Sequence, residues 1–294
     1  MNSFFNQRKK RFRFQSHLLE SYKDNNLSIR MVNSFPDYLG AMRLLYNEYS
    51  TKGLIEKNDS HLYFSPYLLL PRNILFNAVI DNKIIGTIAL IEDSPIGLPI
   101  ENVHFDDIKL QRMSKKARLA EIGSFAVDSK FKNKGITILL YKAMFLYLQD
   151  YKKIDSVLIS VHPRSYNFYL SMFQFKQIGK ERKYDSLNGA RSIPLVMNVR
   201  ETVNILNNNK LFDTNANILE VKDSLKKNIN KENINNAKEK DIFYLPIWKE
   251  SHIKKYFQHC GVNDKSLTSK QKEIIYWLYP SLKFSINKEN NNVI

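Results

Sequence analysis

The sequence predicts an α/β protein in which a mixed, mostly antiparallel sheet is flanked by helices. Short apolar or alternating segments typical of strands recur between residues 28 and 200, and longer segments with helical periodicity separate them. Two pairs of strands are joined by short turns at residues 81–83 and 188–189, as in antiparallel hairpins. One further strand, Ser156–Val161, is largely apolar and follows a helix, which is typical of a buried parallel strand.

Length, charge and cysteine content limit the class of protein. The 294 residues suit one large or two small domains, and the formal net charge is +16. This excess implies an acidic partner, which is nucleic acid, an anionic membrane or an acidic carrier protein. Cys260 is the only cysteine, so no disulfide can form within the chain, as in a reducing compartment. Because no apolar run is long enough to cross a bilayer, we expect a cytoplasmic protein, and peripheral association with a membrane stays open.

Changes in composition divide the chain into four predicted segments. Residues 1–27 are basic and aromatic but poorly patterned, so we expect a flexible tail, with docking on an anionic lipid surface as the alternative. Residues 28–200 hold all the predicted strands and form the main domain. Residues 201–240 are rich in Asn and Lys and are predicted to be a linker, with a short helix near its middle as an option. Residues 241–294 regain aromatic side chains and are predicted to be a small helical segment that packs on the main domain.

Several elements are predicted before residue 118. They are a strand at residues 28–32, a helix from Ser34 or Asp37 to about Lys52, an aromatic loop at 53–71, a hairpin of strands 73–81 and 83–92, and a polar helix at 101–116. Ser34 and Asp37 are both candidates for the helix cap, because either side chain can accept a hydrogen bond from a free N–H group of the first turn. The loop is long for a compact domain, and such loops often form a lid or the wall of a binding site.

The stretch Arg118–Leu140 combines a strand, a basic loop and a helix. Residues 119–127 are apolar enough for a buried strand, and Glu121 lies within it. Glu121 and Val127 are an even number of residues apart, so regular alternation predicts that their side chains share one face. Lys132 and Lys134 lie in the loop, just before apolar residues begin to recur with helical spacing. A basic, Gly-containing loop at a helix start offers N–H groups and a positive helix end to a phosphate.

The remaining elements complete the predicted sheet. Strand 156–161 ends at His162, a short aromatic helix covers residues 166–173, and strands 176–184 and 191–199 form the last hairpin. The six histidines and the single cysteine show no metal-ligand spacing, so no metal is predicted.

The order of these elements and two motifs resemble the GNAT superfamily of acyltransferases. At residues 127–137, VDSKFKNKGIT resembles the superfamily's pyrophosphate loop, with Lys132 at the basic position, Gly135 at the first glycine and Thr137 at the last small residue. At residues 167–175, NFYLSMFQF resembles the superfamily's tyrosine helix, in which Tyr169 matches the tyrosine that usually protonates the departing thiolate. The resemblance implies that an acyl-phosphopantetheine, on carrier protein or coenzyme A, is a co-substrate and that no cofactor is bound permanently.

A narrower resemblance is to the long-chain N-acyl amino acid synthases, which are relatives of the acyl-homoserine-lactone autoinducer synthases. It covers about residues 28–200 and rests on MRLLYNEYS, GTIALIEDSPIGLP, LAEIGSFAV and HPRSYNFYLSMFQFKQIGKERKYDSLNGA. The resemblance implies transfer of a long-chain acyl group from acyl-carrier protein to the amino group of an amino acid. An acidic carrier protein would also give the basic charge of the chain a reason.

The chain departs from the family pattern at Ser124. The related strand usually reads Glu-Ile-Ser-Arg-hydrophobic-Ala-Val, whereas residues 121–127 read EIGSFAV. In the autoinducer synthases that arginine belongs to the charged active-site set. Its replacement by Ser124 leaves open which acceptor is bound and whether the protein catalyses the reaction at all.

Amide formation from a thioester needs a base for the amine, a site for the oxyanion and an acid for the thiolate. The resemblance makes Glu121 the base and Tyr169 the acid, with an ion-paired carboxylate and a core aromatic as the alternatives. Strand N–H groups near Phe125 and Val127 would hold the thioester oxygen if the strand splays or bulges after Ser124.

The same resemblance assigns the donor and acceptor contacts. Lys132, Lys134 and the N–H groups of Gly135, Ile136 and Thr137 would hold the phosphate of the donor, and a solvated basic turn is the alternative. Side chains expected to meet the acceptor are Arg43 for its carboxylate, Asp93 for its amine, Ser124 and His162; surface, turn-capping or structural roles compete. The aromatic and leucine side chains of residues 63–70 would line an acyl groove.

Three other functions compete with acyl transfer to an amino acid. Ser124 and Gln174, where the superfamily usually has glycine, would suit a catalytically silent module that binds an acyl group or a carrier protein. An acyl-coenzyme A-dependent transferase acting on another amine would carry the same phosphate loop. A nucleic-acid binder is supported by the net charge only, and no nucleic-acid-binding motif is present, so we expect no nucleic acid.

Overall fold

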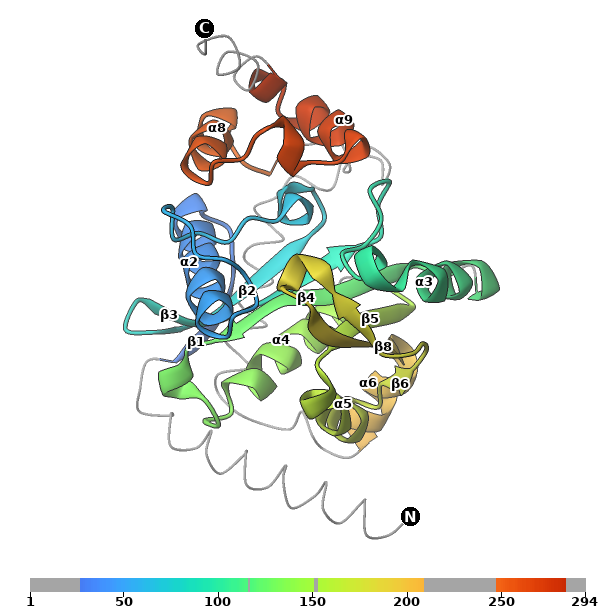
Figure 1. The fold of residues 1–294 in the computed structure, drawn as a ribbon. Coiled ribbons are helices and arrows are strands. Elements are labelled where there is room, and N and C mark those ends of the chain that lie inside the picture. Colours follow the sequence, from blue (N-terminus) through green and yellow to red (C-terminus); the bar gives the residue numbers. More distant parts are fainter. Residues whose placement is uncertain (1–26, 116, 151–152, 209–246, 284–294) are drawn as a thin grey trace, which may run out of the picture.

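The computed structural model describes residues 27–283 apart from residues 116, 151–152 and 209–246. The strands are β1 (Ser28–Met31), β2 (Ile74–Ile80), β3 (Lys83–Glu92), β4 (Leu119–Val127), β5 (Ser156–Val161), β6 (Lys176–Gln177), β7 (Arg182–Tyr184) and β8 (Ala190–Asn198). They are ordered β1-β2-β3-β4-β5-β8-β6 across the sheet, and β7 pairs with β8 off this path (Figure 1). Only β4 and β5 pair in parallel, so the predicted mixed, mostly antiparallel sheet is confirmed.

Helices cover both faces of this sheet. They are α2 (Phe35–Thr51), α3 (Glu101–Lys115), α4 (Ile136–Asp150), α5 (Tyr166–Phe173), α6 (Val199–Asn208), α8 (Glu250–His259) and α9 (Ser269–Leu278). One core cluster joins the sheet to α4, α5 and α6, and a second joins its other face to α2, α8 and α9 (Figure 1). No helix in the described part of the chain is both long and apolar enough to span a membrane.

Local signals place the first helix and the first hairpin as predicted. Of the two candidate caps, Ser34 is the one at the N-cap of α2, where its hydroxyl accepts the N–H of Asp37 at 3.2 Å. β2 and β3 are joined by Asp81 and Asn82, whose φ angles of 47° and 62° match the two-residue turn that suits a twisted hairpin. Asp and Asn tolerate this left-handed conformation better than most residues.

The last predicted hairpin is only partly right. β7 pairs with the first residues of β8 through the turn at Asn188 and Gly189, but Lys176 and Gln177 pair separately, near the other end of β8. On the β6 side, the carbonyl of Pro194 accepts the N–H of Ile178 at 3.1 Å, but Pro194 has no N–H to donate in return, and the pairing of β6 with β8 goes no further. Beyond β8, α6 runs to Asn208, inside the predicted linker; the rest of that linker and the predicted N-terminal tail lie outside the described residues.

A β-bulge interrupts β4 at Ser124. Ala89 of β3 lies opposite Gly123, and Thr87 lies opposite Ala126, so two residues of β4 face one residue of β3. Ser124 has a φ of 44°, in the left-handed region, which lets the extra residue fit. The bulge that the resemblance required is therefore present.

The bulge overturns the predicted alternation along β4. Leu119 and Ala126 pack in the same core cluster, on the α2 face, although they are an odd number of residues apart. Val127 packs against the other cluster, and Glu121 lies opposite Ile91, which belongs to the α2 face. The prediction that Glu121 and Val127 share a face is therefore wrong, because one extra residue at Ser124 reverses the alternation.

The left-handed backbone at Ser124 gives a stability prediction. We expect Ser124→Val to be less stable than Ser124→Gly by about 2 kcal/mol, because a β-branched residue is strained at positive φ and glycine is not. Both changes remove the hydroxyl group, so the difference isolates the backbone term. Urea unfolding of both variants measures it. At Val127, which has no positive φ, Val127→Gly should instead lower stability, and equal stabilities for the two Ser124 variants would contradict the strain.

Helices α8 and α9 pack on the long aromatic loop. The hydroxyl of Tyr256 on α8 donates to the carbonyl of Tyr63 at 2.6 Å, and that of Tyr279, just after α9, donates to the carbonyl of Leu69 at 3.1 Å. Both tyrosines are buried, and their partners lie in the loop between α2 and β2. The described part of the predicted helical segment thus packs on the main domain and holds one wall of it in place.

Candidate functional site

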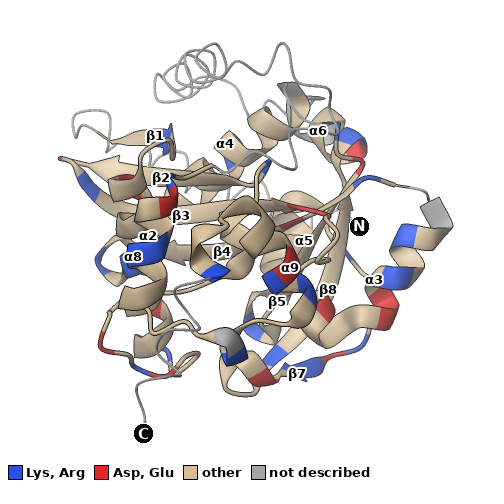
Figure 2. Cartoon of the chain, turned by 90° about the horizontal axis from the view of Figure 1, so that it is seen from above, with Lys and Arg blue, Asp and Glu red and all other residues tan. Residues whose placement is uncertain are grey.

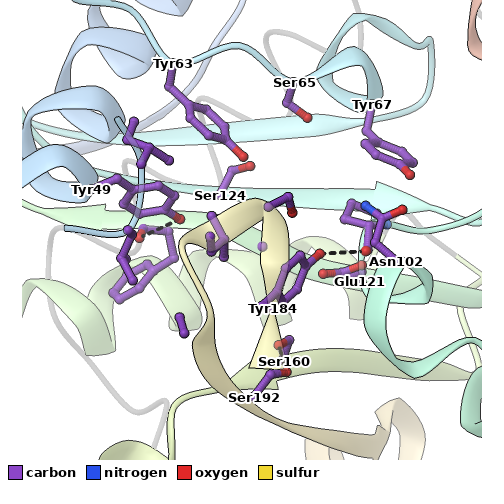
Figure 3. A pocket seen from close by; sticks show the side chains of 18 of the residues that line it. Tyr49, Tyr63, Ser65, Tyr67, Asn102, Glu121, Ser124, Ser160, Tyr184 and Ser192 are labelled. Carbon is purple, nitrogen blue, oxygen red and sulfur yellow. Dashed lines mark hydrogen bonds between the residues drawn. The ribbon is translucent and has the colours of Figure 1, made fainter. Parts of the chain in front are cut away.

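A cavity of about 660 Å³ lies on the α2 face of the sheet. The long loop after α2 forms one wall, with Tyr63, Ser65 and Tyr67, and β7 contributes Tyr184 (Figure 3). Cys260, Ser266 and Gln271 of the C-terminal helical segment also reach it. The loop that was predicted to form a binding wall therefore lines a real cavity.

The floor of the cavity lies where two strands part. β4 and β5 pair only from Leu119–Ser156 to Glu121–Leu158, although both strands continue further. Beyond these pairs, residues 122–125 of β4, residues 159–161 of β5 and His162 just after it all line the cavity. The end of pairing, together with the bulge at Ser124, opens the sheet at this point.

Glu121 is a buried carboxylate at this opening. Its side chain is 5% exposed and one carboxylate oxygen accepts the N–H of Ile100 at 2.7 Å. Burial raises the pKa of Glu121 to about 8; the Ile100 hydrogen bond opposes the rise and the Glu101 carboxylate adds to it. Neither Arg43 nor Arg118, the two arginines nearest to hand for an ion-paired carboxylate in the sequence, is among the groups that shift the pKa of Glu121.

Hydroxyl groups of aromatic side chains surround Glu121 (Figure 3). Burial raises the pKa of Tyr63 to about 12, and the Glu121 carboxylate adds to the rise. The same two causes, burial first, raise the pKa of Tyr67 and of Tyr184, whose hydroxyl donates to the carbonyl of Pro99 at 2.7 Å. These phenols stay protonated and can donate hydrogen bonds, so the cavity offers a mostly neutral, hydroxyl-rich surface around one carboxyl group.

Two tyrosines lie against the bulge. The hydroxyl of Tyr49 donates to the carbonyl of Phe125 at 3.4 Å, and the hydroxyl of Tyr63 points toward Ser124 (Figure 3). The N–H of Asp128 donates to the carbonyl of Ile85, so by the alternation of an antiparallel ladder the N–H of Val127 points away from β3 and toward β5. An N–H group with this direction is available as a donor at the opening between the strands, and its role in holding the thioester oxygen stays a prediction.

Tyr169 lies on α5 and reaches the same cavity. It is buried, and its hydroxyl lies 3.3 Å from that of Tyr141 on α4. Burial raises the pKa of Tyr169, with the hydrogen bond from Tyr141 opposing. A phenol that keeps its proton in the cavity can serve as an acid for a thiolate, as predicted, and it packs in the core as well.

The predicted phosphate loop lies at the start of α4. Lys132 and Lys134 are exposed, and Nζ of Lys134 lies 5.1 Å from the ring centroid of Phe131. Gly135 has a φ of 81°, which turns the chain into the helix. Within the described residues, the N–H groups of residues 135–137 have no hydrogen-bond partner, as is usual for a first helical turn. This end of α4 is therefore a positive, hydrogen-bond-donating surface.

Three predicted acceptor residues lie apart from the buried end of the cavity. Arg43 is exposed on α2 and does not line the cavity. Asp93 forms a bidentate pair with Arg112 of α3, at 2.7 and 2.9 Å, and does not line it either. His162 does line it, but is exposed, and its Nδ1 accepts the N–H of Arg164 at 3.2 Å. Ser124 lines the cavity directly.

Sequence reasoning missed much of the hydroxyl lining. Tyr184 was seen only as the end of a strand, and Asn102, Ser160 and Ser192 were not singled out. These side chains come from α3, β5, β7 and β8, and only the topology brings them together (Figure 3). One available signal was Ser160 within an apolar strand, since a buried polar residue needs a partner.

Comparison with known proteins places this site in a family. The family model of the N-acyl amino acid synthase FeeM matches residues 40–198. The solved structure of FeeM from uncultured soil microbes is 25% identical, with a TM-score of 0.53, and the alignment covers 60% of this chain and 93% of that one. Comparison with curated protein sequences gave no match.

Two acyl-homoserine lactone synthases are more distant. LasI is 15% identical over 59% of this chain and 89% of its own, with a TM-score of 0.44. The coenzyme A-dependent BjaI is 12% identical over 68% of this chain and 99% of its own, also with a TM-score of 0.44. The match at residues 40–198 spans more than half of the 294 residues. The chain therefore belongs to the N-acyl amino acid synthase FeeM family and is a GNAT-like N-acyltransferase.

Proposed function

We propose that the protein transfers a long-chain acyl group from the phosphopantetheine thioester of acyl-carrier protein to the amino group of an amino acid. The observation that carries this proposal is the buried Glu121, with its pKa raised to about 8, at the parting of β4 and β5 in a cavity of about 660 Å³. A carboxylate of this basicity is matched to an α-amino group, whose pKa is about 8 in peptides.

The proposed reaction uses the geometry in three steps. The amine nitrogen loses a proton and attacks the thioester carbon, which forms the C–N bond and a tetrahedral oxyanion. N–H groups of β4 near Phe125 and Val127 would stabilise that oxyanion. The C–S bond then breaks, the nitrogen loses a second proton, and the thiolate takes a proton, which Tyr169 would supply. The amide and the free phosphopantetheine thiol are the products.

The donor would enter from the start of α4. The N–H groups of residues 135–137, with Lys132 and Lys134, would hold its phosphate, and the arm would run along β4 toward Glu121. The acyl chain would lie against the aromatic wall formed by Tyr63, Phe64 and Tyr67. Because both carrier protein and coenzyme A present this arm, an experiment must distinguish between these two donors.

The net charge supports a carrier protein as donor without fixing where it docks. In the view of Figure 2, basic and acidic residues are interspersed along α3 and α9. The described surface in this view thus carries both signs of charge, while the whole chain has a net charge of +16. An acidic carrier protein would be attracted by that net charge at long range.

The test is acylation by the purified protein. Palmitoyl-acyl-carrier protein and palmitoyl-coenzyme A are each incubated with a set of single amino acids, tyrosine included, and products are identified by mass spectrometry. We expect an N-palmitoyl amino acid, formed faster from the carrier protein. If product forms from palmitoyl-coenzyme A but not from the carrier protein, the proposed donor is wrong. If the thioester binds but no amino acid gives a product, the catalytically silent binding module is favoured.

Lipid extracts of cells that overproduce the protein provide the second arm of this test. A new N-acyl amino acid should appear there and should be absent from cells that produce Glu121→Gln at the same level. The extract reports the natural acyl chain and acceptor without a prior choice of substrate. Identical lipids in both cultures would argue against the proposed function.

A further inference from the structure

A hydrogen-bonded chain leads from the cavity into the protein. The hydroxyl oxygens of Ser160 on β5 and Ser192 on β8 (Figure 3) lie 2.5 Å apart. The Ser192 oxygen lies 2.8 Å from Nε2 of His104. Ser160 and Ser192 line the cavity, whereas His104 on α3 is 0% exposed. A buried base is thus connected to the cavity through two hydroxyl groups.

The environment of His104 sets the direction of this chain. Nδ1 lies 3.6 Å from a carboxylate oxygen of Asp107, so the nearby negative charge favours the proton on Nδ1. Nε2 is then free to accept the hydroxyl of Ser192, Ser192 accepts that of Ser160, and the lone pairs of Ser160 face the cavity. A proton that arrives at Ser160 can therefore reach Nε2 without a change in heavy-atom positions.

The position of His104 and Asp107 depends on a kink in α3 and on a close approach to Gly179. α3 is kinked at His104, where φ is −118° and ψ is 36°, and a side chain on Gly179 would collide with the Asp107 carboxylate. Arg182 lies 3.1 Å from the same carboxylate. Burial, and then the charge of Arg182, lower the pKa of His104, and Asp107 opposes this, so the ring is neutral and able to accept a proton.

The contact between the His104 ring and the Asp107 carboxylate is longer than a hydrogen bond. Nδ1 of His104 is buried and has no hydrogen-bond partner among the described residues, and Oδ2 of Asp107, 3.6 Å from it, is ion-paired with Arg182 at 3.1 Å. A histidine with a purely structural role would be expected to satisfy both ring nitrogens. When Nε2 gains a proton, the imidazolium is attracted to Asp107, and this long contact can shorten. The pair is arranged to stabilise a charge that is not present in the resting protein.

Glu121 and Ser160, the cavity end of the hydrogen-bonded chain, face the same space. Leu158 of β5 lies opposite Glu121 of β4, and Ser160 is two residues further along on the same face. Both side chains line the cavity where the two strands part. An amine nitrogen between them can hydrogen-bond to both side chains.

We propose that Ser160, Ser192 and His104 form a proton relay that takes one of the two protons lost by the acceptor amine. This inference rests on the proposed function, in which an ammonium group, R–NH3+, becomes an amide, R–NH–CO–R′. Glu121 takes one proton before attack. After the C–N bond has formed, the nitrogen gives a second proton to Ser160, Ser160 gives its own to Ser192, and Ser192 gives its own to Nε2. The C–S bond breaks and Tyr169 protonates the thiolate. The cycle is completed when the relay proton returns by the reverse path to water, water gives a proton back to Tyr169, and Glu121 releases to water the proton that it took, so that one proton is released in all.

Two variants test the relay by turnover. His104→Gln keeps a group that can hydrogen-bond to Ser192 but cannot take a proton, and Ser192→Ala breaks the chain. Each should lower kcat by about ten- to a hundredfold with little change in the KM for the donor. Ser156→Ala is the matched control, since Ser156 is buried on the same strand and does not line the cavity. We expect wild-type kcat from it.

The number of protons that move in the rate-limiting transition state distinguishes a relay from a structural role. The rate is measured in mixtures of H2O and D2O at saturating donor and acceptor. Wild type and Ser156→Ala should give a curved dependence on deuterium content, and Ser192→Ala and His104→Gln a linear one. Curvature of the same size in all four proteins would overturn the relay and leave the proposed function intact.

A spectroscopic arm does not depend on turnover. In protein with 15N-labelled histidine, Nε2 of His104 should show an unprotonated, hydrogen-bond-accepting resonance at pH 7. Ser192→Ala should shift that resonance, and Ser160→Ala should move the pKa at which it titrates. If neither change moves it, the relay is wrong even when no substrate is turned over. If both move it while no acylated product forms, the proposed function fails and the hydrogen-bonded chain stands.

Discussion

Replacing Glu121 with Gln is expected to lower kcat by about a hundred- to ten-thousand-fold, because the amide keeps the shape of the carboxyl group but cannot take a proton. Donor affinity should not change, since the phosphate contacts lie at the start of α4. In wild type, kcat/KM should rise with pH up to about pH 8 as the carboxyl group ionises, and this rise should be absent from the residual activity of the variant. Steady-state rates measured from about pH 5.5 to about pH 9, a range that brackets this pKa, show both effects.

The same variant should be more stable than wild type at alkaline pH. The pKa of Glu121 is raised from 4.5 to about 8 in the fold, so below its ordinary value both folded and unfolded chains carry the proton and the two proteins should match. As the pH rises toward 8, the unfolded carboxyl group ionises first, and wild type loses stability that the neutral Gln keeps. One pKa unit corresponds to about 1.4 kcal/mol, so the difference can approach about 5 kcal/mol.

Urea unfolding at acid and alkaline pH checks this difference. The other titrating groups that interact with residue 121, namely Glu101, Tyr49, Tyr63, Tyr67 and Tyr184, are present in both proteins, so the comparison isolates Glu121. Equal stability at alkaline pH would mean that the carboxyl group titrates normally. A wild-type rate of acylation by the variant would refute the assignment of Glu121 as the base.

The double change Lys132→Glu and Lys134→Glu should weaken donor binding by about a hundredfold. Both lysines are exposed, so the free energy of unfolding should hardly change. Reversed charge beside the free N–H groups of residues 135–137 would repel a phosphate that the wild-type helix start attracts. Calorimetry with palmitoyl-acyl-carrier protein and with palmitoyl-coenzyme A measures both affinities.

A control of equal charge separates a local contact from long-range attraction. Lys109→Glu with Lys254→Glu alters the net charge by the same amount at exposed positions on α3 and α8. That control should slow association with carrier protein at low salt and leave the affinity for coenzyme A thioester unchanged. If both double variants behave alike, the phosphate site is not at the start of α4.

The sequence was most informative where local patterns decide the structure. The hairpin turn at Asp81 and Asn82, the cap at Ser34 and the helix after Gly135 each depend on a few neighbouring residues, and each lies where predicted. The strand that carries Glu121 could be placed from its apolar pattern. The resemblance then indicated the family, which the match over residues 40–198 shows.

Features that depend on distant contacts escaped prediction. The bulge at Ser124 leaves no local trace and reverses the side-chain directions after it. Asp93 was expected at the acceptor, but Arg112 from the next helix pairs with it. The chain from Ser160 to His104 joins β5, β8 and α3, and the two ends of its Ser192–His104 hydrogen bond lie 88 residues apart in sequence. No window of neighbouring residues contains that information.

The packing of α8 and α9 on the aromatic loop determines when the cavity can exist. The bond from Tyr279 to Leu69 joins residues 210 apart, and that from Tyr256 to Tyr63 joins residues 193 apart. During synthesis the sheet and the carboxyl group of Glu121 are therefore complete before the residues that hold the opposite wall have been made. A nascent chain that ends before residue 256 can fold its sheet but lacks both restraints on the wall. We therefore expect acyl transfer to become available only late in translation, after these helices have docked.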